Sequence, residues 1–182
     1  MKKKFTSNNK TVVLWFSGLS GSGKTTIALL LKDVLVEKGK KVDILDGDVV
    51  RGLLNRHLGF SRNDIRKNNM SIAKLASKRL ADFDFILVPI IAPYNEDRIM
   101  AKNIIGSNNF IEIFIKTPLE QCIKRDPKGL YKKALNGEIN NFIGICDETP
   151  YEEPSSPDII IETTKLSIVE AVNNILDNLK YT

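Results

Sequence analysis

The sequence contains few of the residues that build disulfide-linked, zinc-binding or membrane-spanning proteins. Two cysteines, Cys122 and Cys146, and one histidine, His57, occur among 182 residues. Neither cysteine belongs to a CxxC pair, so we expect no zinc site and no disulfide framework. No apolar run reaches the roughly 18 residues of a membrane helix, and the basic N-terminus leads into polar residues rather than the apolar core of a secretory signal. We therefore expect a protein of the reducing cytoplasm with no membrane partner.

The chain also has little excess charge beyond its first ten residues. It is 42% hydrophobic, and its length is typical of one domain that can bury a core without covalent staples. The formal net charge is +5, from 27 basic and 22 acidic residues. Residues 1–10 hold four lysines and no acid, and without them the balance is 23 basic against 22 acidic residues. We expect a flexible basic tail at 1–10, a single domain at 11–182, and no nucleic-acid partner, because short basic tails are usually only solvated.

Segments typical of strands alternate along the chain with segments typical of helices. Such alternation predicts an α/β fold with a parallel sheet covered by helices on both faces. Pro89 lies near the end of one strand and is expected to end the ladder there. Residues 117–157 have weak periodicity and many polar residues, and we interpret them as a mobile lid. Strands are predicted at 11–17, 41–45, 85–91, 110–116 and 158–162, and helices at 25–38, 64–80, 118–125 and from 167 onward.

One motif carries a clear chemical meaning. Residues 18–25 read GLSGSGKT, which fits the phosphate-binding P-loop pattern G-x-x-x-x-G-K-[ST] between a strand and a helix. Glycines let backbone N–H groups point at a phosphate chain, Lys24 adds a cation for the β- and γ-phosphates, and the Thr25 hydroxyl can bind Mg²⁺. The motif predicts a nucleoside triphosphate and Mg²⁺ as cofactors, and we expect ATP because a GTPase base-reading motif such as N-K-x-D is absent. The residues expected to bind ATP here are Gly18, Leu19, Ser20, Gly21, Ser22, Gly23, Lys24, Thr25 and Thr26.

Two aspartates follow the second predicted strand and should lie near the P-loop. Asp46 and Asp48 flank Gly47, and open α/β sheets bind ligands at the carboxyl ends of their strands. A carboxylate there can organise magnesium-bound water or accept a proton from an acceptor hydroxyl. One of the two residues also fits a helix N-cap. We assign the catalytic role to Asp48, together with Lys24, and place Arg51 on the same helical face.

The longer motifs resemble those of the adenylylsulfate kinase (APS kinase) family. The matching segments are GLSGSGKTTIA, LDGDVVRGLLNRHLGFS, PYNEDRIMAK, FIEIFIKTPLEQCIKRDPKGLYKKALNGEINNFIGI and PYEEP, which together cover nearly the whole chain. The resemblance implies a P-loop nucleotide kinase-like three-layer sandwich with a five-stranded parallel sheet and a lid. It also implies transfer of the ATP γ-phosphate to the 3′-hydroxyl of adenylyl sulfate in sulfate assimilation, small nucleotide substrates as partners, and a homodimer.

The resemblance also implies roles for individual residues of the acceptor site. Asp48 corresponds to the acid on the acceptor and magnesium side, Arg51 to a contact with the phosphosulfate group, and Lys128 to a lid cation that faces the phosphates. Phe60 and Phe142 correspond to the pair of rings that sandwich the acceptor adenine, which suits the stacking of a purine on aromatic faces. Further substrate contacts are implied for Asn68 and Ile91, and an ATP contact for Arg125.

Several positions depart from the family pattern, and most of them belong to the acceptor site. Val49 replaces an asparagine, Ala92 replaces a serine and Asn95 replaces an arginine. Ile65 occupies the position of another arginine, and its neighbour Arg66 is a candidate substitute, although one residue turns a helical side chain by about 100°. Because a charged hydrogen bond to an anion is typically worth roughly 1.5–3 kcal/mol, these losses are large enough to alter acceptor specificity.

Two other functions therefore remain open at this stage. One is a kinase of the same family that acts on a different nucleotide acceptor, such as cytidine diphosphoramidate. The other is a non-catalytic nucleotide-binding module, which an intact P-loop beside an altered acceptor pocket also fits. An acceptor screen separates them, because the non-catalytic module would bind ATP without acceptor-dependent turnover.

Overall fold

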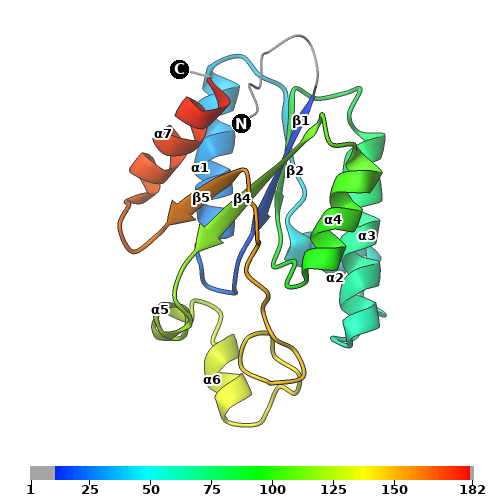
Figure 1. The fold of residues 1–182 in the computed structure, drawn as a ribbon, viewed down its shortest axis with the longest axis vertical. Helices are drawn as coiled ribbons and strands as arrows, with labels where there is room; N and C mark the ends of the chain where they lie inside the picture. Colours follow the sequence, from blue (N-terminus) through cyan, green and yellow to red (C-terminus); the bar gives the residue numbers. More distant parts are fainter. Residues whose placement is uncertain (1–10, 181–182) are drawn as a thin grey trace.

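A computed structural model describes residues 11–180, and in this part of the chain five parallel strands form one sheet (Figure 1). The strand order is β2-β3-β1-β4-β5, so the strand that precedes the P-loop lies in the centre. The predicted basic tail at 1–10 lies outside the described residues. The strands are β1 (Val12–Ser17), β2 (Val42–Ile44), β3 (Phe85–Pro89), β4 (Phe110–Lys116) and β5 (Ile159–Glu162).

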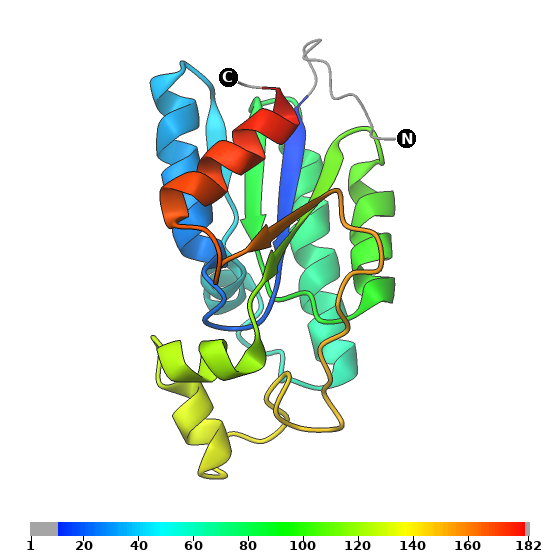
Figure 2. The same cartoon turned by 60° about the vertical axis from the view of Figure 1, so that its left-hand side comes forward.

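Helices cover both faces of this sheet, as Figures 1 and 2 show. Helices α1 and α7 pack on one face and share a core with alternate residues of the strands, among them Leu14 and Phe16. Helices α2, α3 and α4 pack on the other face, where Val13 and Trp15 point. The helices are α1 (Lys24–Glu37), α2 (Gly47–Leu54), α3 (Arg62–Lys78), α4 (Asn95–Ile105), α5 (Leu119–Arg125), α6 (Leu130–Leu135) and α7 (Ile168–Leu179).

The predicted parallel sheet with helices on both faces is confirmed, and its three inner strands β1, β3 and β4 are mostly buried, as their apolar runs require. Every residue of β3 is buried, because helices cover both of its faces. The ladder ends at Pro89, which pairs with Phe16 of the central strand. The capping box at the start of α7 is present in both directions between Ser167 and Glu170.

Parts of the helix prediction were wrong or incomplete. Ile168 and Val169, the apolar residues at the start of α7, are 46% and 59% exposed, and Ala171 is the first buried residue of this helix. Helix α4 was not predicted, because its buried face includes the charged side chains Asp97 and Arg98, which interrupt the apolar periodicity. The short helix α6 was not predicted either, since it lies in the polar segment assigned to the lid.

The segment between β4 and β5 lies beyond the carboxyl edge of the sheet. Figures 1 and 2 show α5, α6 and a long loop below the strand ends, next to the turn that joins β1 to α1. This arrangement sets the predicted lid opposite the predicted P-loop. None of the helices between residues 11 and 180 is long and apolar enough to cross a membrane.

Candidate active site

The P-loop folds into a tight turn between β1 and α1. Gly18 has a φ of 148°, and a Cβ atom there would lie 2.7 Å from the carbonyl oxygen of Ile115 in the neighbouring strand, so only glycine fits this position. Gly23 precedes α1 in the left-handed conformation, and no side chain caps this helix. The first N–H groups of α1 therefore lack a side-chain acceptor, as in helix N-termini that bind phosphate.

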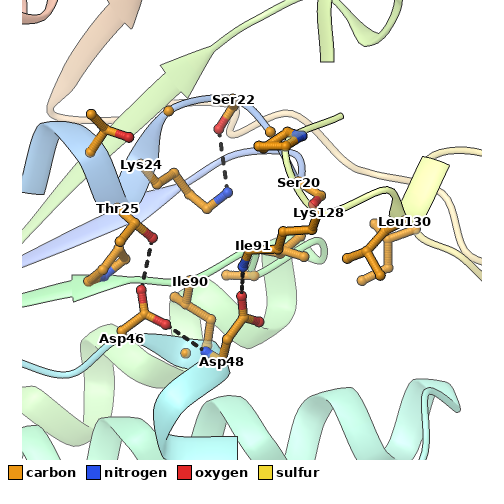
Figure 3. Close-up of a pocket in the computed structure, with 18 of the residues that line it drawn as sticks. Ser20, Ser22, Lys24, Thr25, Asp46, Asp48, Ile90, Ile91, Lys128 and Leu130 are labelled. Carbon is orange, nitrogen blue, oxygen red and sulfur yellow. Dashed lines mark hydrogen bonds and ion pairs between the residues drawn. The ribbon is translucent and has the colours of Figure 1, made fainter. Parts of the chain in front are cut away.

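Lys24 is a buried cation that forms no ion pair with a carboxylate of residues 11–180. It is 8% exposed, and its Nζ donates to the carbonyl oxygen of Leu19 at 2.6 Å and to the Ser22 hydroxyl at 3.4 Å (Figure 3). Burial lowers the pKa of Lys24 to about 8, and the nearby Asp48 carboxylate opposes this effect. A buried ammonium that has only neutral partners is ready to pair with a ligand anion.

Thr25 and Asp46 bring a hydroxyl and a carboxylate together beside the P-loop. The Thr25 hydroxyl donates to Asp46 Oδ2 at 2.8 Å (Figure 3). The other oxygen, Oδ1, caps α2 by accepting from the backbone N–H groups of Asp48 and Val49 at 2.9 and 3.3 Å. The N-cap role anticipated for one of the two aspartates thus belongs to Asp46, which also contacts the residue expected to bind Mg²⁺.

Asp48 lies in the first turn of α2, and its carboxylate contacts the ammonium of Lys128 across the pocket (Figure 3). Both side chains remain more than half exposed, at 68% and 54%. An exposed pair of this kind contributes little stability. The importance of the contact lies in its location. It brings together, at the cavity, the acid Asp48 and the cation Lys128, which were predicted from distant parts of the sequence.

Arg51 and Phe60 form a second contact on the acceptor side. The guanidinium of Arg51 lies 4.1 Å from the centre of the Phe60 ring, a cation–π geometry. Its Nη2 also donates to the carbonyl oxygens of Leu58, at 2.9 Å, and Gly59. These bonds hold the loop between α2 and α3, and they orient both Arg51 and Phe60 toward the cavity that they line.

A single cavity of about 800 Å³ joins these groups. This volume lies within the range of small-molecule sites. Its lining comes from the P-loop, from α2 and α3, and from residues 117–157. Of the predicted residues, the cavity is lined by Ser20, Gly21, Ser22, Gly23, Lys24, Thr25, Thr26, Asp48, Arg51, Phe60, Asn68, Ile91, Arg125, Lys128 and Phe142.

Three predicted residues do not line this cavity. Gly18 and Leu19 lie at the start of the P-loop, where Leu19 contributes the carbonyl oxygen that binds Lys24. Arg66 is exposed on α3, whereas Ile65 is 4% exposed and lines the cavity. The one-residue shift along the helix therefore turns the Arg66 side chain away from the cavity.

Side chains of residues 117–157, the segment predicted to be a lid, contact the P-loop, and Thr117 donates to the carbonyl oxygen of Ser22 at 3.1 Å. The Tyr131 hydroxyl donates to the carbonyl oxygen of Ser20 at 3.0 Å, and its ring meets Phe142 edge to face at 5.0 Å. Arg125 donates to the carbonyl oxygens of Ser22 and Thr163 at 3.3 and 3.2 Å. No sequence motif points to Tyr131, and only this contact with the P-loop reveals its role.

A buried arginine supports the acceptor side, and sequence reasoning missed it. Arg98 is 3% exposed and pairs with Glu112 of β4 at 3.1 Å. It also donates to the carbonyl oxygens of Ala92 at 2.5 Å and Glu152 at 2.7 Å, and to the side chain of Asn95 at 2.5 Å. Ala92 has a φ of 44°, unusual for a residue with a side chain, so Arg98 stabilises a strained turn of the cavity wall.

The residues present also fit a magnesium ion bound together with a nucleotide. No group of three or more His, Cys, Asp or Glu side chains in residues 11–180 could hold a metal on its own. Mg²⁺ in kinases usually takes one or two protein ligands and completes its shell with phosphate and water. Thr25 and Asp46 supply such a minimal set of ligands.

Comparison with known proteins places this geometry among phosphotransferases. A family model described as adenylylsulphate kinase matches residues 10–162. The adenylyl-sulfate kinase of Bacteroides thetaiotaomicron is 47% identical over 167 residues, which are 92% of this chain and 82% of that protein. The adenylyl-sulfate kinase of Oceanobacillus iheyensis is 47% identical over 175 residues, which are 96% of this chain and 86% of that protein.

Solved structures show the same similarity at the level of the fold. The APS kinase of Mycobacterium tuberculosis in complex with AMPPNP and APS superposes with a TM-score of 0.90 and 39% identity, over 95% of this chain and 99% of that one. A shikimate kinase from Aquifex aeolicus superposes with a TM-score of 0.57 at 18% identity, which shows a shared fold alone.

Proposed function

This chain belongs to the adenylylsulphate kinase family, and we propose that it transfers the γ-phosphate of ATP to the 3′-hydroxyl of adenylyl sulfate. The observation that carries the proposal is the shared cavity. It holds the P-loop cation Lys24 and the acid–cation pair of Asp48 and Lys128 in one space of about 800 Å³. A related structure contains both an ATP analogue and APS, and the fold of this chain matches that structure closely.

In the proposed reaction, the P-loop binds the β- and γ-phosphates of ATP. Lys24 pairs with phosphate oxygens in place of its present neutral partners, and N–H groups at the start of α1 donate to the same oxygens. Arg125 is held at the ATP end of the cavity by its bonds to Ser22 and Thr163. Binding of the phosphate anion favours the charged form of Lys24 and so raises its lowered pKa.

On the acceptor side, Asp48 orients the 3′-hydroxyl and accepts its proton as the oxygen attacks the γ-phosphorus. The bond from the 3′-oxygen to phosphorus forms while the bond from phosphorus to the leaving oxygen of ADP breaks. Lys128 and Arg51 stabilise the anionic acceptor, and Phe60, Phe142, Asn68 and Ile91 line the space for the rest of it. Catalysis then consists mainly of positioning and electrostatic stabilisation, as is general for phosphoryl transfer.

We propose Mg²⁺ as the accompanying metal, with Thr25 and the Asp46 carboxylate as its protein-side ligands or as ligands of its bound water. When bound, the ion would neutralise charge on the β- and γ-phosphates. Residues 117–157 are proposed to act as a lid, supported by the contacts of Tyr131 and Arg125 with the P-loop. A homodimer and a place in sulfate assimilation belong to the same proposal, and the resemblance to the family supports them.

The experiment is an assay with purified protein, ATP, Mg²⁺ and adenylyl sulfate that measures ADP release and the 3′-phosphorylated product together. We expect turnover that depends on both substrates, and loss of more than about 100-fold in kcat for Asp48→Asn, because the proton acceptor is gone. Protein that binds ATP but phosphorylates no acceptor would instead establish the non-catalytic module.

A further inference from the structure

The central strand β1 and its neighbour β3 separate at the carboxyl edge of the sheet. Phe16 pairs with Pro89, and just beyond this pair the backbone N–H of Gly18 donates to the carbonyl oxygen of Ile91 at 3.3 Å. The chain after β1 then forms the P-loop, and the chain after β3 forms the turn around Ala92 that lines the cavity. The ladder therefore ends before the segments that are proposed to hold the two substrates.

A buried carboxylate joins these two segments through side chains. Glu112 of β4 lies next to β1, opposite Trp15 in the ladder. Its Oε1 accepts a hydrogen bond from the Ser17 hydroxyl at 3.2 Å and pairs with Nε of Arg98 at 3.1 Å. Arg98 in turn donates through Nη1 to the carbonyl oxygen of Ala92 at 2.5 Å. One carboxylate oxygen thus connects the residue before the P-loop to the turn of the cavity wall.

The other donors of Arg98 hold the chain on its way to β5. Its Nη2 donates to the carbonyl oxygen of Glu152 at 2.7 Å and to the side chain of Asn95 at 2.5 Å. The Glu152 backbone N–H donates to the carbonyl oxygen of Pro93 at 2.8 Å. Because the guanidinium is planar and bonded along its whole length, it has one orientation, and its anchor on the sheet is Glu112.

Burial makes this connection stiff. Ser17 is fully buried, and the side chains of Arg98 and Glu112 are 3% and 14% exposed. Hydrogen bonds and ion pairs are stronger in such low-dielectric surroundings than in water. A buried ion pair nevertheless often adds no more stability than apolar side chains of the same volume, so stability alone is a weak reason for this pair. None of the three side chains lines the cavity of the described structure, so they act on substrates only through other groups.

We propose that Glu112 is a positioning residue that sets the P-loop and the Ala92 turn at a fixed separation, through Ser17 on one side and Arg98 on the other. The inference rests on the proposed function, in which the P-loop holds the ATP phosphates and the cavity wall bounds the acceptor. Transfer requires the 3′-oxygen close to the γ-phosphorus and in line with it, and a misplacement of about 1 Å can cost about 100-fold in rate. Glu112 therefore controls the rate of transfer more than the affinity for ATP.

Ser17→Ala breaks the connection on the P-loop side alone. It removes one hydrogen bond and leaves the pair of Arg98 and Glu112 in place. We expect kcat for transfer from ATP to adenylyl sulfate to fall by at least about tenfold. The Kd for AMPPNP and the KM for adenylyl sulfate should stay within about threefold of their values in the unaltered protein. Calorimetry with AMPPNP also counts the binding-competent sites, so kcat is expressed per site and unfolded protein does not contribute.

Glu112→Gln removes the charge of the carboxylate and keeps its shape. The kcat per site should fall at least as far as in Ser17→Ala, and the KM for adenylyl sulfate should rise as well, because Arg98 loses its anchor and the Ala92 turn loosens. The double variant should be no slower than Glu112→Gln alone, because both substitutions break the same connection.

Asp43→Asn is the matched control. Asp43 pairs with Arg79, their side chains are 19% and 39% exposed, and neither residue lines the cavity. The substitution removes a carboxylate charge from a partly buried pair, as Glu112→Gln does, but away from both substrate sites. Urea unfolding should show a loss of stability, whereas kcat per site should stay within about twofold of the unaltered protein.

The outcomes separate this inference from the proposed function. Unchanged kcat per site in Ser17→Ala would overturn the positioning role and leave the proposed function intact, and this variant decides alone if Glu112→Gln does not fold. An equal loss of kcat and of AMPPNP affinity would also overturn it, since it marks a general disturbance of the P-loop. A double variant much slower than Glu112→Gln would refute the shared connection. Unaltered protein that binds AMPPNP but transfers no phosphate to adenylyl sulfate would refute both.

Discussion

Replacing Arg98 with methionine should destabilise the protein strongly, because it leaves a carboxylate buried without its partner. Arg98 and Glu112 are paired at 3.1 Å, and their side chains are 3% and 14% exposed. The substitution keeps an unbranched side chain of similar reach but removes the charge and every donor. It therefore also frees the carbonyl oxygens of Ala92 and Glu152.

The expected loss follows from the burial of this pair. Removing one partner of a buried ion pair typically costs about 3–5 kcal/mol, because the remaining charge stays uncompensated. Burial already raises the pKa of Glu112, while the Arg98 charge lowers it and the Ser17 hydroxyl stabilises the carboxylate. Without Arg98 the pKa of Glu112 should rise further, so the folded variant binds a proton more readily than the unfolded chain.

Because the pKa of Glu112 rises, the loss of stability in Arg98→Met should depend on pH. A carboxyl group whose pKa is higher in the folded state contributes stability at low pH and loses it as the pH rises through that pKa. The Arg98→Met deficit should therefore be largest at neutral pH and shrink as the pH falls through the raised pKa of Glu112, where the buried carboxyl group becomes protonated and neutral.

Urea unfolding of both proteins at several pH values measures the deficit. Lys116→Met is the matched control, because Lys116 and Glu153 form an exposed pair at 3.9 Å and its removal should cost less than about 1 kcal/mol. The acceptor KM should also rise in Arg98→Met relative to the ATP KM, since Arg98 holds the Ala92 turn of the cavity wall. A deficit below about 1 kcal/mol, or one that stays constant with pH, would refute the reasoning.

Three further outcomes are expected. Lys24→Met should weaken ATP binding by at least about tenfold in calorimetry. In the unaltered protein, ATP affinity should fall as the pH rises above about 8, because Lys24 then loses its charge. The free energy of unfolding of the free protein should increase between about pH 8 and pH 10.5, because the folded state releases the Lys24 proton before the unfolded chain does. Gly18→Ala should lower stability by about 1–3 kcal/mol, measured by thermal unfolding, because its Cβ would collide with the Ile115 carbonyl oxygen; an unchanged melting temperature would contradict this. Tyr131→Phe should lower the free energy of unfolding by about 0.5–1.5 kcal/mol, because the hydrogen bond to Ser20 is lost. The variant should also be cleaved faster by proteases between residues 117 and 157, and equal cleavage rates would argue against a lid held by this bond.

The prediction of the fold from sequence succeeded where apolar runs and short-range signals decide the structure. The central strands are buried on both faces, so their composition alone distinguishes them from amphipathic segments. The capping box of α7 is likewise a local pattern. Helix α4 escaped prediction because Asp97 and Arg98 are buried on its inner face, and their partners Arg62 and Glu112 come from other elements.

The candidate site divides in the same way. The P-loop is contiguous in sequence, so its residue types predict both its geometry and its chemistry. The roles of Asp46 and Tyr131 depend on contacts with residues 21 and 111 positions away, Thr25 and Ser20. Similarly, the sequence left Arg66 as a candidate substitute for Ile65, and only the rotation of α3 against the cavity excludes it from the lining.

By itself, then, the sequence determined the parallel α/β sheet, the phosphate-binding turn and the family, because each depends on neighbouring residues or on apolar period. The tertiary structure decided which charges reach the cavity. It joined Asp48 to Lys128, 80 positions apart, and it directed Arg62 and Arg66 away from the acceptor. The energy between two charges falls with the distance between them and with screening by water, so it depends on the final packing of helices rather than on the places of the residues in the chain.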